Sequence, residues 1–169
     1  MSDTVYNLPI TGIASFAKYP ICTNLSQLDD ADVCVMGIPF DAGAPYLSGC
    51  KFGPRRIREV SCHYGRGDAG FWDPERQTQF LASPVKIVDG ADVDVDPMMF
   101  QETFDRITKT VEKILDKGAL PVMMGGDHSV TYPIARALDR FDDLCIVQFD
   151  AHLDFGRRRY TNGSPMRLI

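Results

Sequence analysis

The sequence lacks any long apolar run. None approaches the roughly 20 consecutive apolar residues that a helix needs to span a bilayer. The first ten residues, MSDTVYNLPI, have neither the basic start nor the apolar core of a secretory signal. We therefore expect no membrane span and a cytoplasmic location.

Paired cysteines and basic clusters are also missing. The five cysteines form no C-x-x-C pair, a pattern that suits neither a disulfide framework nor a zinc knuckle. We expect reduced thiols, with Cys34 and Cys145 inside strands. The net charge of −5 argues against a nucleic-acid partner, because neutralising phosphates requires a basic face. The one dense basic run is expected to be a solvated loop, and it consists of Arg157, Arg158 and Arg159.

The composition is that of a soluble globular protein, with 169 residues, 44% of them hydrophobic and 24% charged. A chain of this length can bury about two thirds of its unfolded surface. We expect residues 1–169 to form a single α/β domain. Residues 166–169 look like the start of a helix, so the domain is expected to be incomplete at its C-terminus.

Apolar runs alternate with amphipathic segments along the chain. Phe100, Phe104, Ile107, Val111 and Ile114 recur at steps of four and three, and a glycine at position 118 can end that helix. Strands that are apolar on both faces and alternate with such helices predict a parallel sheet flanked by helices. The predicted strands are 31–39, 85–95, 119–124 and 144–149, the predicted helices are 54–60, 97–118 and 131–140, and residues 68–83 are expected to be irregular.

Two polar motifs follow predicted strands, where open α/β sheets bind ligands. GGDHS occupies residues 125–129 and DAHLD occupies residues 150–154. In an extended segment Asp150, His152 and Asp154 would point to one face, and their carboxylates would repel one another without a cation. His128 supplies a fourth ligand. Oxygen and imidazole ligands without thiolate suit manganese, with nickel, iron or zinc as competitors.

Structural roles for the same residues have to be weighed. A lone aspartate after a strand is usually a turn or a helix cap, and a lone histidine is usually structural. However, the chain has three histidines and two of them lie in these motifs, which favours a metal site. We interpret Asp127 as a residue that orients a ligand and Ser129 as a helix cap. Three further aspartates imitate a metal motif but precede a helix, and they are Asp92, Asp94 and Asp96.

These motifs together make the chain resemble the ureohydrolase superfamily of arginases and agmatinases, and its agmatinases most closely. VMGIPFDAGAPYLSGCKFGPRRIREVS is similar to the family's first strand and glycine-rich loop, MMGGDHS and FDAHLD to its metal motifs, and NGSPMR to its substrate loop. The resemblance implies a three-layer arginase-like fold with two manganese ions per subunit, nickel being possible. It also implies trimers or hexamers. Asp150 would bridge both metals, His128 and Asp154 would complete the first, and His152 would bind the second.

The resemblance also implies the reaction, hydrolysis of a C–N bond in a linear amidine. The substrate would be agmatine or a similar guanidino compound, such as guanidinobutyrate or guanidine, and the products would be urea and an amine. A guanidinium is a poor electrophile, and a two-metal site can lower the pKa of water from about 15.7 to near 7. Asp154 would be catalytic as well as a ligand, by accepting a hydrogen bond from the attacking water.

Two departures from the family pattern leave other functions open. No S-x-D-x-D motif follows Asp154, and Asn162 stands where relatives usually have a histidine that relays protons. Asparagine cannot titrate, so Asn162 would bind substrate by hydrogen bonds or be a plain turn residue. A non-catalytic ureohydrolase-like partner subunit is the alternative. A metallophosphoesterase is less favoured, because the chain lacks a G-N-H-D motif and a basic clamp for phosphate.

Overall fold

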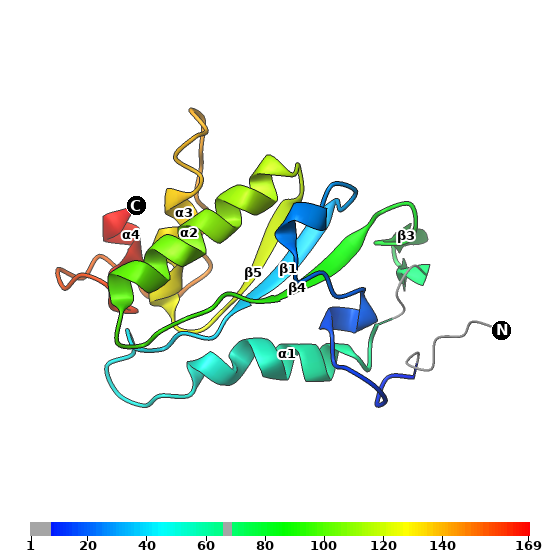
Figure 1. Cartoon of the computed structure of the whole chain (residues 1–169), viewed down its shortest axis with the longest axis horizontal. Coiled ribbons are helices and arrows are strands. Elements are labelled where there is room, and N and C mark those ends of the chain that lie inside the picture. The colour runs from blue at the N-terminus through cyan, green and yellow to red at the C-terminus, as the bar shows by residue number, and fades with distance from the viewer. Residues whose placement is uncertain (1–7, 66–68) are drawn as a thin grey trace. The chain divides into compact units, whose positions relative to one another are not determined.

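The computed structural model describes residues 8–65 and 69–169 (Figure 1). The chain divides into two compact units. Unit 1 comprises Met1–Met36, Arg55–Ala91 and Ile114–Val122, as far as these ranges are described, and unit 2 comprises Gly37–Pro54, Asp92–Lys113 and Met123–Ile169. In the described part of the chain, no helix has both the length and the apolar character needed to cross a bilayer.

A three-stranded parallel sheet has the order β4-β1-β5, with helices flanking it. Its strands are β4 (Ile87–Asp92), β1 (Val33–Ile38) and β5 (Leu120–Gly125). The central strand β1 is buried from Cys34 onward, as expected for a strand that is apolar on both faces. The strands predicted at 31–39, 85–95 and 119–124 are therefore confirmed, with bounds shifted by a few residues.

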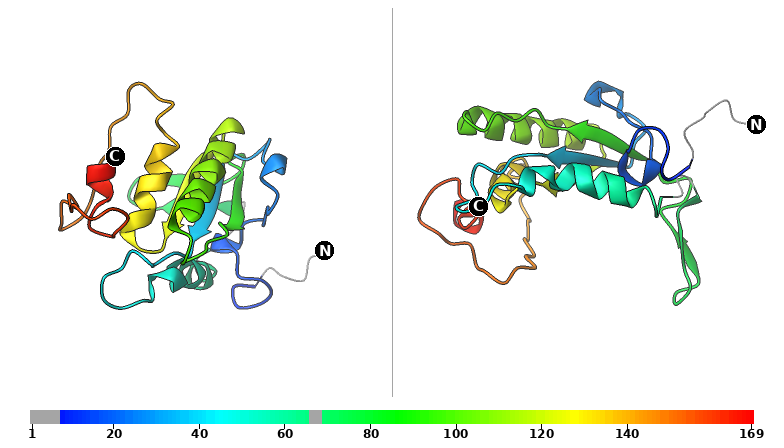
Figure 2. Two further views of the ribbon diagram at one scale, coloured as in Figure 1. Left: turned by 60° about the vertical axis from the view of Figure 1, so that its left-hand side comes forward. Right: turned by 90° about the horizontal axis from the view of Figure 1, so that it is seen from below.

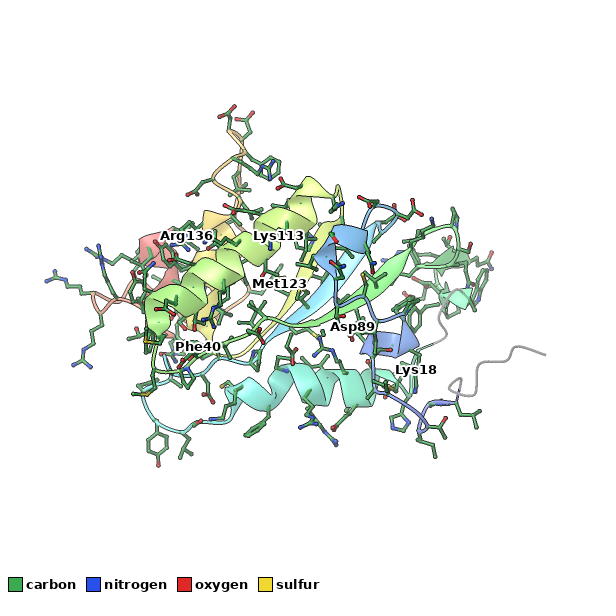
Figure 3. The ribbon with its side chains drawn as sticks, viewed as in Figure 1. Lys18, Phe40, Asp89, Lys113, Met123 and Arg136 are labelled. Atoms are coloured by element: carbon green, nitrogen blue, oxygen red, sulfur yellow. The ribbon has the colours of Figure 1, made fainter. Side chains whose placement is uncertain are left out.

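In unit 1 a buried ion pair joins the helix α1 (Gly53–Ser61) to the sheet. Arg58 on α1 forms an ion pair with Asp89 on β4. The side chain of Asp89 points from the strand toward the helix (Figure 3). Asp89 also accepts a hydrogen bond from the backbone N–H of Phe16 at 2.6 Å. The carboxylate thus connects three segments of unit 1 that are far apart in the sequence.

The helix α2 (Phe100–Asp116) has the buried face that its periodicity predicts. Phe104, Ile107, Val111 and Ile114 are all buried. Gly118 follows the helix with a φ of 78°, the left-handed conformation expected just after a helix end. In unit 2 the ring of Phe104 packs against several other aromatic rings, which are those of Phe40, Phe100, Tyr132 and Tyr160.

One segment predicted to be irregular is a hairpin. The strands β2 (Phe71–Asp73) and β3 (Thr78–Phe80) pair antiparallel, with Trp72 opposite Gln79. The Asp73 carboxylate accepts hydrogen bonds from two backbone N–H groups of the connecting turn, at 2.9 and 3.1 Å. The pattern gave no sign of this hairpin because its side chains are mostly exposed and carry no apolar alternation.

The strand predicted at 144–149 is wrong. These residues are irregular chain (Figure 2), and Val147 and Phe149 are 72% and 98% exposed. A strand that is apolar on both faces is stable only when both faces are covered, and no described element covers this one. Cys145 is consequently exposed rather than inside a strand.

The end of the chain contains two short helices. The helix predicted at 131–140 is shorter than expected, because α3 (Thr131–Arg136) ends in turns. The helix start expected at 166–169 is present as α4 (Pro165–Leu168), with its proline in the first turn. All five cysteines have free thiols, as predicted.

Candidate metal centre

The turn that carries His128 is fixed by the carboxylate of Asp127. Asp127 precedes the 3-10 helix η5 (His128–Val130), and its Oδ1 accepts the N–H of Ser129 at 2.8 Å. Its Oδ2 accepts the N–H of Gly43 at 2.8 Å. Asp127 is therefore the helix cap, a role that the sequence had suggested for Ser129. It orients the ligand through the backbone rather than by touching the imidazole.

A glycine is required at position 126 for this turn to form. A Cβ there would lie only 1.9 Å from the carbonyl oxygen of Phe40. The backbone at this point also donates two hydrogen bonds to the chain that follows β1, from Gly126 N to Ile38 O and from Asp127 N to Phe40 O. The two loops that follow β1 and β5 are thereby held together within unit 2.

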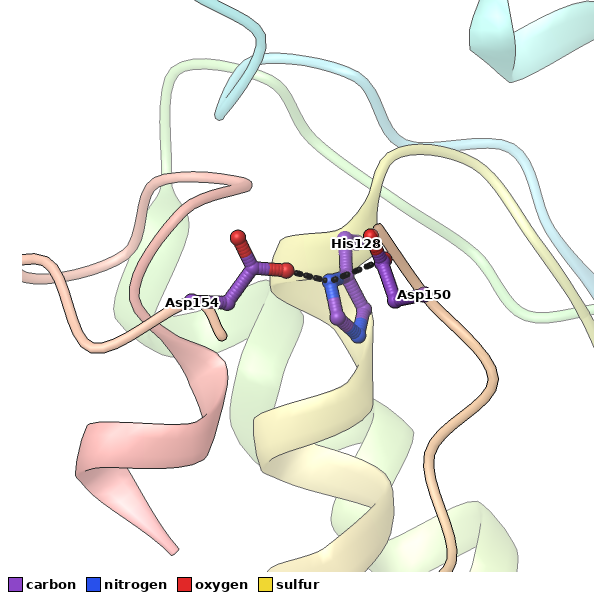
Figure 4. Close-up of side chains that lie close together, drawn as sticks. All are labelled: His128, Asp150 and Asp154. Carbon is purple, nitrogen blue, oxygen red and sulfur yellow. Dashed lines mark hydrogen bonds and ion pairs between the residues drawn. The ribbon is translucent and has the colours of Figure 1, made fainter. Parts of the chain in front are cut away.

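His128, Asp150 and Asp154 form a compact group of candidate metal ligands (Figure 4). One ligand atom from each lies within 4.8 Å of the others. The Nδ1 of His128 is 2.5 Å from Oδ2 of Asp154 and 3.9 Å from Oδ2 of Asp150. Two carboxylates and one imidazole form the donor set that manganese and related divalent ions accept. These three residues therefore fit a metal ion.

His152 is not part of this group in the structure. Its side chain is 83% exposed, and its Nδ1 lies 3.6 Å from Oδ1 of Asp150. The backbone N–H of His152 donates to Asp150 Oδ1 at 2.8 Å, and such a bond bends the chain between the two residues. Asp154 has a positive φ of 49°. The segment is therefore not extended, and its three side chains do not share one face.

The same backbone hydrogen bond affects the charge of the group. Chiefly through the N–H of His152, and further through the nearby imidazoles of His128 and His152, the pKa of Asp150 is lowered from its ordinary value. Asp150 is thus an anion at neutral pH, as a metal ligand must be. The aspartates at 92, 94 and 96 do not belong to any such group among the described residues.

Asn162 lies at the base of a closed loop between Asp154 and α4. Its backbone N–H donates to the carbonyl oxygen of Gly43 at 3.1 Å. Gly156 N and Gly163 O close the loop with a bond of 2.7 Å. Tyr160 anchors it, with its ring 5.0 Å from that of Phe104 in an edge-on arrangement. No role was predicted for Gly43 or Tyr160, because the contacts of Gly43 with Asn162 and of Tyr160 with Phe104 join segments more than 50 residues apart.

A third residue that was missed is Asp41, which organises the loop after β1. Its Oδ2 accepts hydrogen bonds from Ser48 Oγ at 2.8 Å and from Gly49 N at 2.7 Å. Burial alone would raise the pKa of Asp41, but the hydrogen bonds from Gly49, Ser48 and Lys51 outweigh it, and the pKa is lowered. The only signal in the sequence was the density of glycine and proline in this loop.

A parallel sheet with a histidine and two aspartates beyond β5 defines an α/β protein with a candidate metal centre. The chain belongs to the arginase family, whose sequence profile matches residues 31–169. It is 33% identical over 162 residues to the human guanidino acid hydrolase, mitochondrial, covering 92% of this chain and 43% of that protein. It is 35% identical over 132 residues to the agmatinase of Bacillus subtilis (strain 168), covering 76% of this chain and 42% of that protein.

Comparison with solved structures also points to the arginase family. The structure of Trypanosoma cruzi formiminoglutamase with Mn2+ matches with a TM-score of 0.74 at 27% identity, covering 84% of this chain and 48% of that one. The chain spans about half the length of the relatives it matches. The ureohydrolase resemblance and the parallel sheet flanked by helices are therefore confirmed.

Proposed function

We propose that the protein is a manganese-dependent hydrolase that converts a guanidino compound to urea and an amine. Agmatine, guanidinobutyrate and guanidine are the candidate substrates. The proposal is supported above all by the group formed by His128, Asp150 and Asp154. Membership of the arginase family adds support, because relatives are named for acting on guanidino acids and agmatine.

Each residue has a role in this proposal. His128, Asp150 and Asp154 would hold the first ion, and Asp150 and His152 would contribute to a second. Two bound manganese ions, with nickel as the alternative, would lower the pKa of water to near 7 and so supply hydroxide. Asp154 would also accept a hydrogen bond from the attacking water, and Asn162 would bind the substrate by hydrogen bonds. Assembly into trimers or hexamers and a cytoplasmic location belong to the same proposal.

Two observations favour a second candidate, a non-catalytic partner subunit of a related hydrolase. His152 is largely exposed and outside the ligand group. Asn162, in place of the histidine usual in relatives, cannot transfer a proton. Such a subunit would bind one ion through His128, Asp150 and Asp154 without hydrolysing any guanidine.

Urea release separates the two candidates. Protein from the complete reading frame is stripped with EDTA, reloaded with manganese or nickel, and assayed with agmatine, 4-guanidinobutyrate and guanidine. Metal occupancy is measured on the same samples. The first candidate predicts urea from at least one substrate and its loss in His128→Ala. The matched control is His63→Ala, which changes an exposed histidine in the turn that follows α1. One bound ion per chain without urea from any substrate would support the partner subunit.

A further inference from the structure

The loop from Gly156 to Gly163, here called the arginine loop, is held in a defined conformation. The bond from Gly156 N to Gly163 O closes its base. Thr161 N and Ser164 Oγ are joined at 3.1 Å next to it. The hydroxyl of Tyr160 donates to Gln101 Oε1 at 3.2 Å. Its tip, which carries Arg157, Arg158 and Arg159, is therefore attached to unit 2 at both ends.

The three arginines of this tip have no partner among the described residues. All are exposed, and none makes a hydrogen bond or ion pair within residues 8–65 and 69–169. Two arginines elsewhere in the described part of the chain are paired with carboxylates, Arg58 with Asp89 and Arg136 with Asp105. Three adjacent cations repel one another and add no stability of their own. Their presence on an ordered loop of an acidic chain therefore suggests an anion outside the chain.

The arginine loop begins close to the candidate metal centre. Arg157 is three residues from Asp154, so their Cα atoms can be at most about 11 Å apart along an extended chain. The Debye length at physiological ionic strength is about 8 Å, so the charge of Arg157 is only partly screened from a ligand bound next to it. At the other end of the loop lies Asn162, the residue proposed to contact substrate. A guanidino compound bound between Asp154 and Asn162 would thus lie beside the loop that carries these cations.

We propose that the arginine loop selects guanidino substrates whose far end is a carboxylate. This inference rests on the proposed function and adds the substrate class to it. The guanidinium head is common to all candidates, so it cannot discriminate between them. The tail can, because cations attract the carboxylate of a guanidino acid and repel the ammonium of agmatine. Arg157, Arg158 and Arg159 would be specificity-determining residues, outside the chemistry at Asp150 and Asp154.

The test uses three substrates of similar length that differ in tail charge: 4-guanidinobutyrate, butylguanidine and agmatine. With manganese-loaded protein we expect kcat/KM to fall in that order. In the triple variant R157Q/R158Q/R159Q we expect kcat/KM for 4-guanidinobutyrate to fall about tenfold, kcat/KM for agmatine to rise, and that for butylguanidine to change less than about twofold. Added salt should weaken the preference in the wild type and hardly affect it in the variant.

A matched control removes three charges elsewhere in unit 2. R106Q/K109Q/K113Q changes three exposed residues of α2 and should leave the order of substrates intact. If the control shifts the substrate order as much as the loop variant does, net charge rather than the loop explains the preference. Equal use of agmatine and 4-guanidinobutyrate by the wild type would overturn the inference while leaving the hydrolase intact.

Direct binding keeps the inference testable if no urea is formed. Calorimetric Kd values are measured for 4-guanidinobutyrate and butylguanidine on the wild type and on the triple loop variant. Absence of urea from all three substrates and from guanidine contradicts the proposed function. Tighter binding of 4-guanidinobutyrate that disappears in the loop variant would still support the inference, and equal Kd values would overturn it.

Discussion

Arg58 and Asp89 form a two-point ion pair in the core of unit 1. Nε of Arg58 lies 2.8 Å from Oδ2 of Asp89, and Nη2 lies 3.0 Å from Oδ1. The two side chains are 9% and 2% exposed. Arg58 also donates to the carbonyl oxygen of Ala91 at 2.6 Å. Removing either charge would therefore take away the charged partner that the other faces in the core.

Loss of this pair should destabilise unit 1 strongly. For Asp89→Asn we expect the free energy of unfolding to fall by about 3–5 kcal/mol, because the buried guanidinium of Arg58 loses the carboxylate charge that it faces in the core. Urea denaturation followed by circular dichroism measures the change. The control is Glu59→Gln, which removes the exposed pair with Arg56 and should cost less than about 1 kcal/mol. Similar losses of unfolding free energy in Asp89→Asn and Glu59→Gln would contradict a stabilising role for the buried pair.

The carboxylate of Asp127 should matter for metal affinity without touching the metal. In Asp127→Ala the N–H groups of Gly43 and Ser129 lose their acceptor, so the turn that carries His128 is no longer fixed. We expect manganese affinity, measured by calorimetry, to fall by about tenfold or more, in the range seen for residues that orient ligands.

Ser129→Ala provides the control for that experiment. The hydroxyl of Ser129 is buried and makes no hydrogen bond in the described part of the chain. Removing it should change manganese affinity little, because no interaction is lost. An equal loss of affinity in both variants would show that any change in the turn matters, and would contradict a specific role for the carboxylate.

The sequence predicted the parts of the fold that depend on local periodicity. The buried face of α2 and the turn glycine at position 118 follow from the spacing of apolar residues, and the strand β1 follows from an apolar run. The strand at 144–149 was wrong because its stability depends on covering layers, which are not a property of the segment. The hairpin of β2 and β3 was missed for the opposite reason, since its pairing relies on backbone bonds that leave no hydrophobic pattern.

The candidate site, too, could be predicted only in part from the sequence. The two polar motifs pointed to His128, Asp150 and Asp154, which form one candidate group in the structure, although the strand predicted before Asp150 is absent. The position of His152 could not be predicted, because it depends on the hydrogen bond from its own N–H to Asp150. Gly43 and Tyr160 were beyond prediction as well. Their roles arise from contacts with Asp127, Asn162 and Phe104, which only the tertiary structure creates.

Asp41 should give stability a specific dependence on pH. Because its pKa is lowered in the folded protein, the carboxylate stabilises the fold at pH values above the unfolded pKa, which is about 3.9. This contribution is lost as the pH falls through the lower folded value. We expect Asp41→Asn to reduce the free energy of unfolding at pH 6, with a difference from the wild type that shrinks below about pH 4.

Denaturation of wild type and variant at a series of pH values measures this difference. The same substitution at Asp30, which is 89% exposed, is the control and should have little effect at any pH. A difference for Asp41→Asn that stays constant from pH 6 to pH 3 would mean that the loop loses something other than the ionised carboxylate.

Tyr160 should determine how firmly the arginine loop is held. Its ring packs on Phe104 and its hydroxyl bonds to Gln101, so Tyr160→Ala removes both contacts and Tyr160→Phe only the second.

Backbone amide exchange reports the effect, because Asn162 N–H and Gly156 N–H are both bonded in the closed loop and exchange when it opens. We expect exchange across residues 156–163 to be about tenfold faster or more in Tyr160→Ala, since truncating a packed aromatic ring loses more than the 1.4 kcal/mol that a tenfold change requires. Tyr160→Phe should stay close to the wild type. Unchanged protection in Tyr160→Ala would mean that the backbone bonds alone close the loop, and the tip arginines would then be held without help from the aromatic cluster.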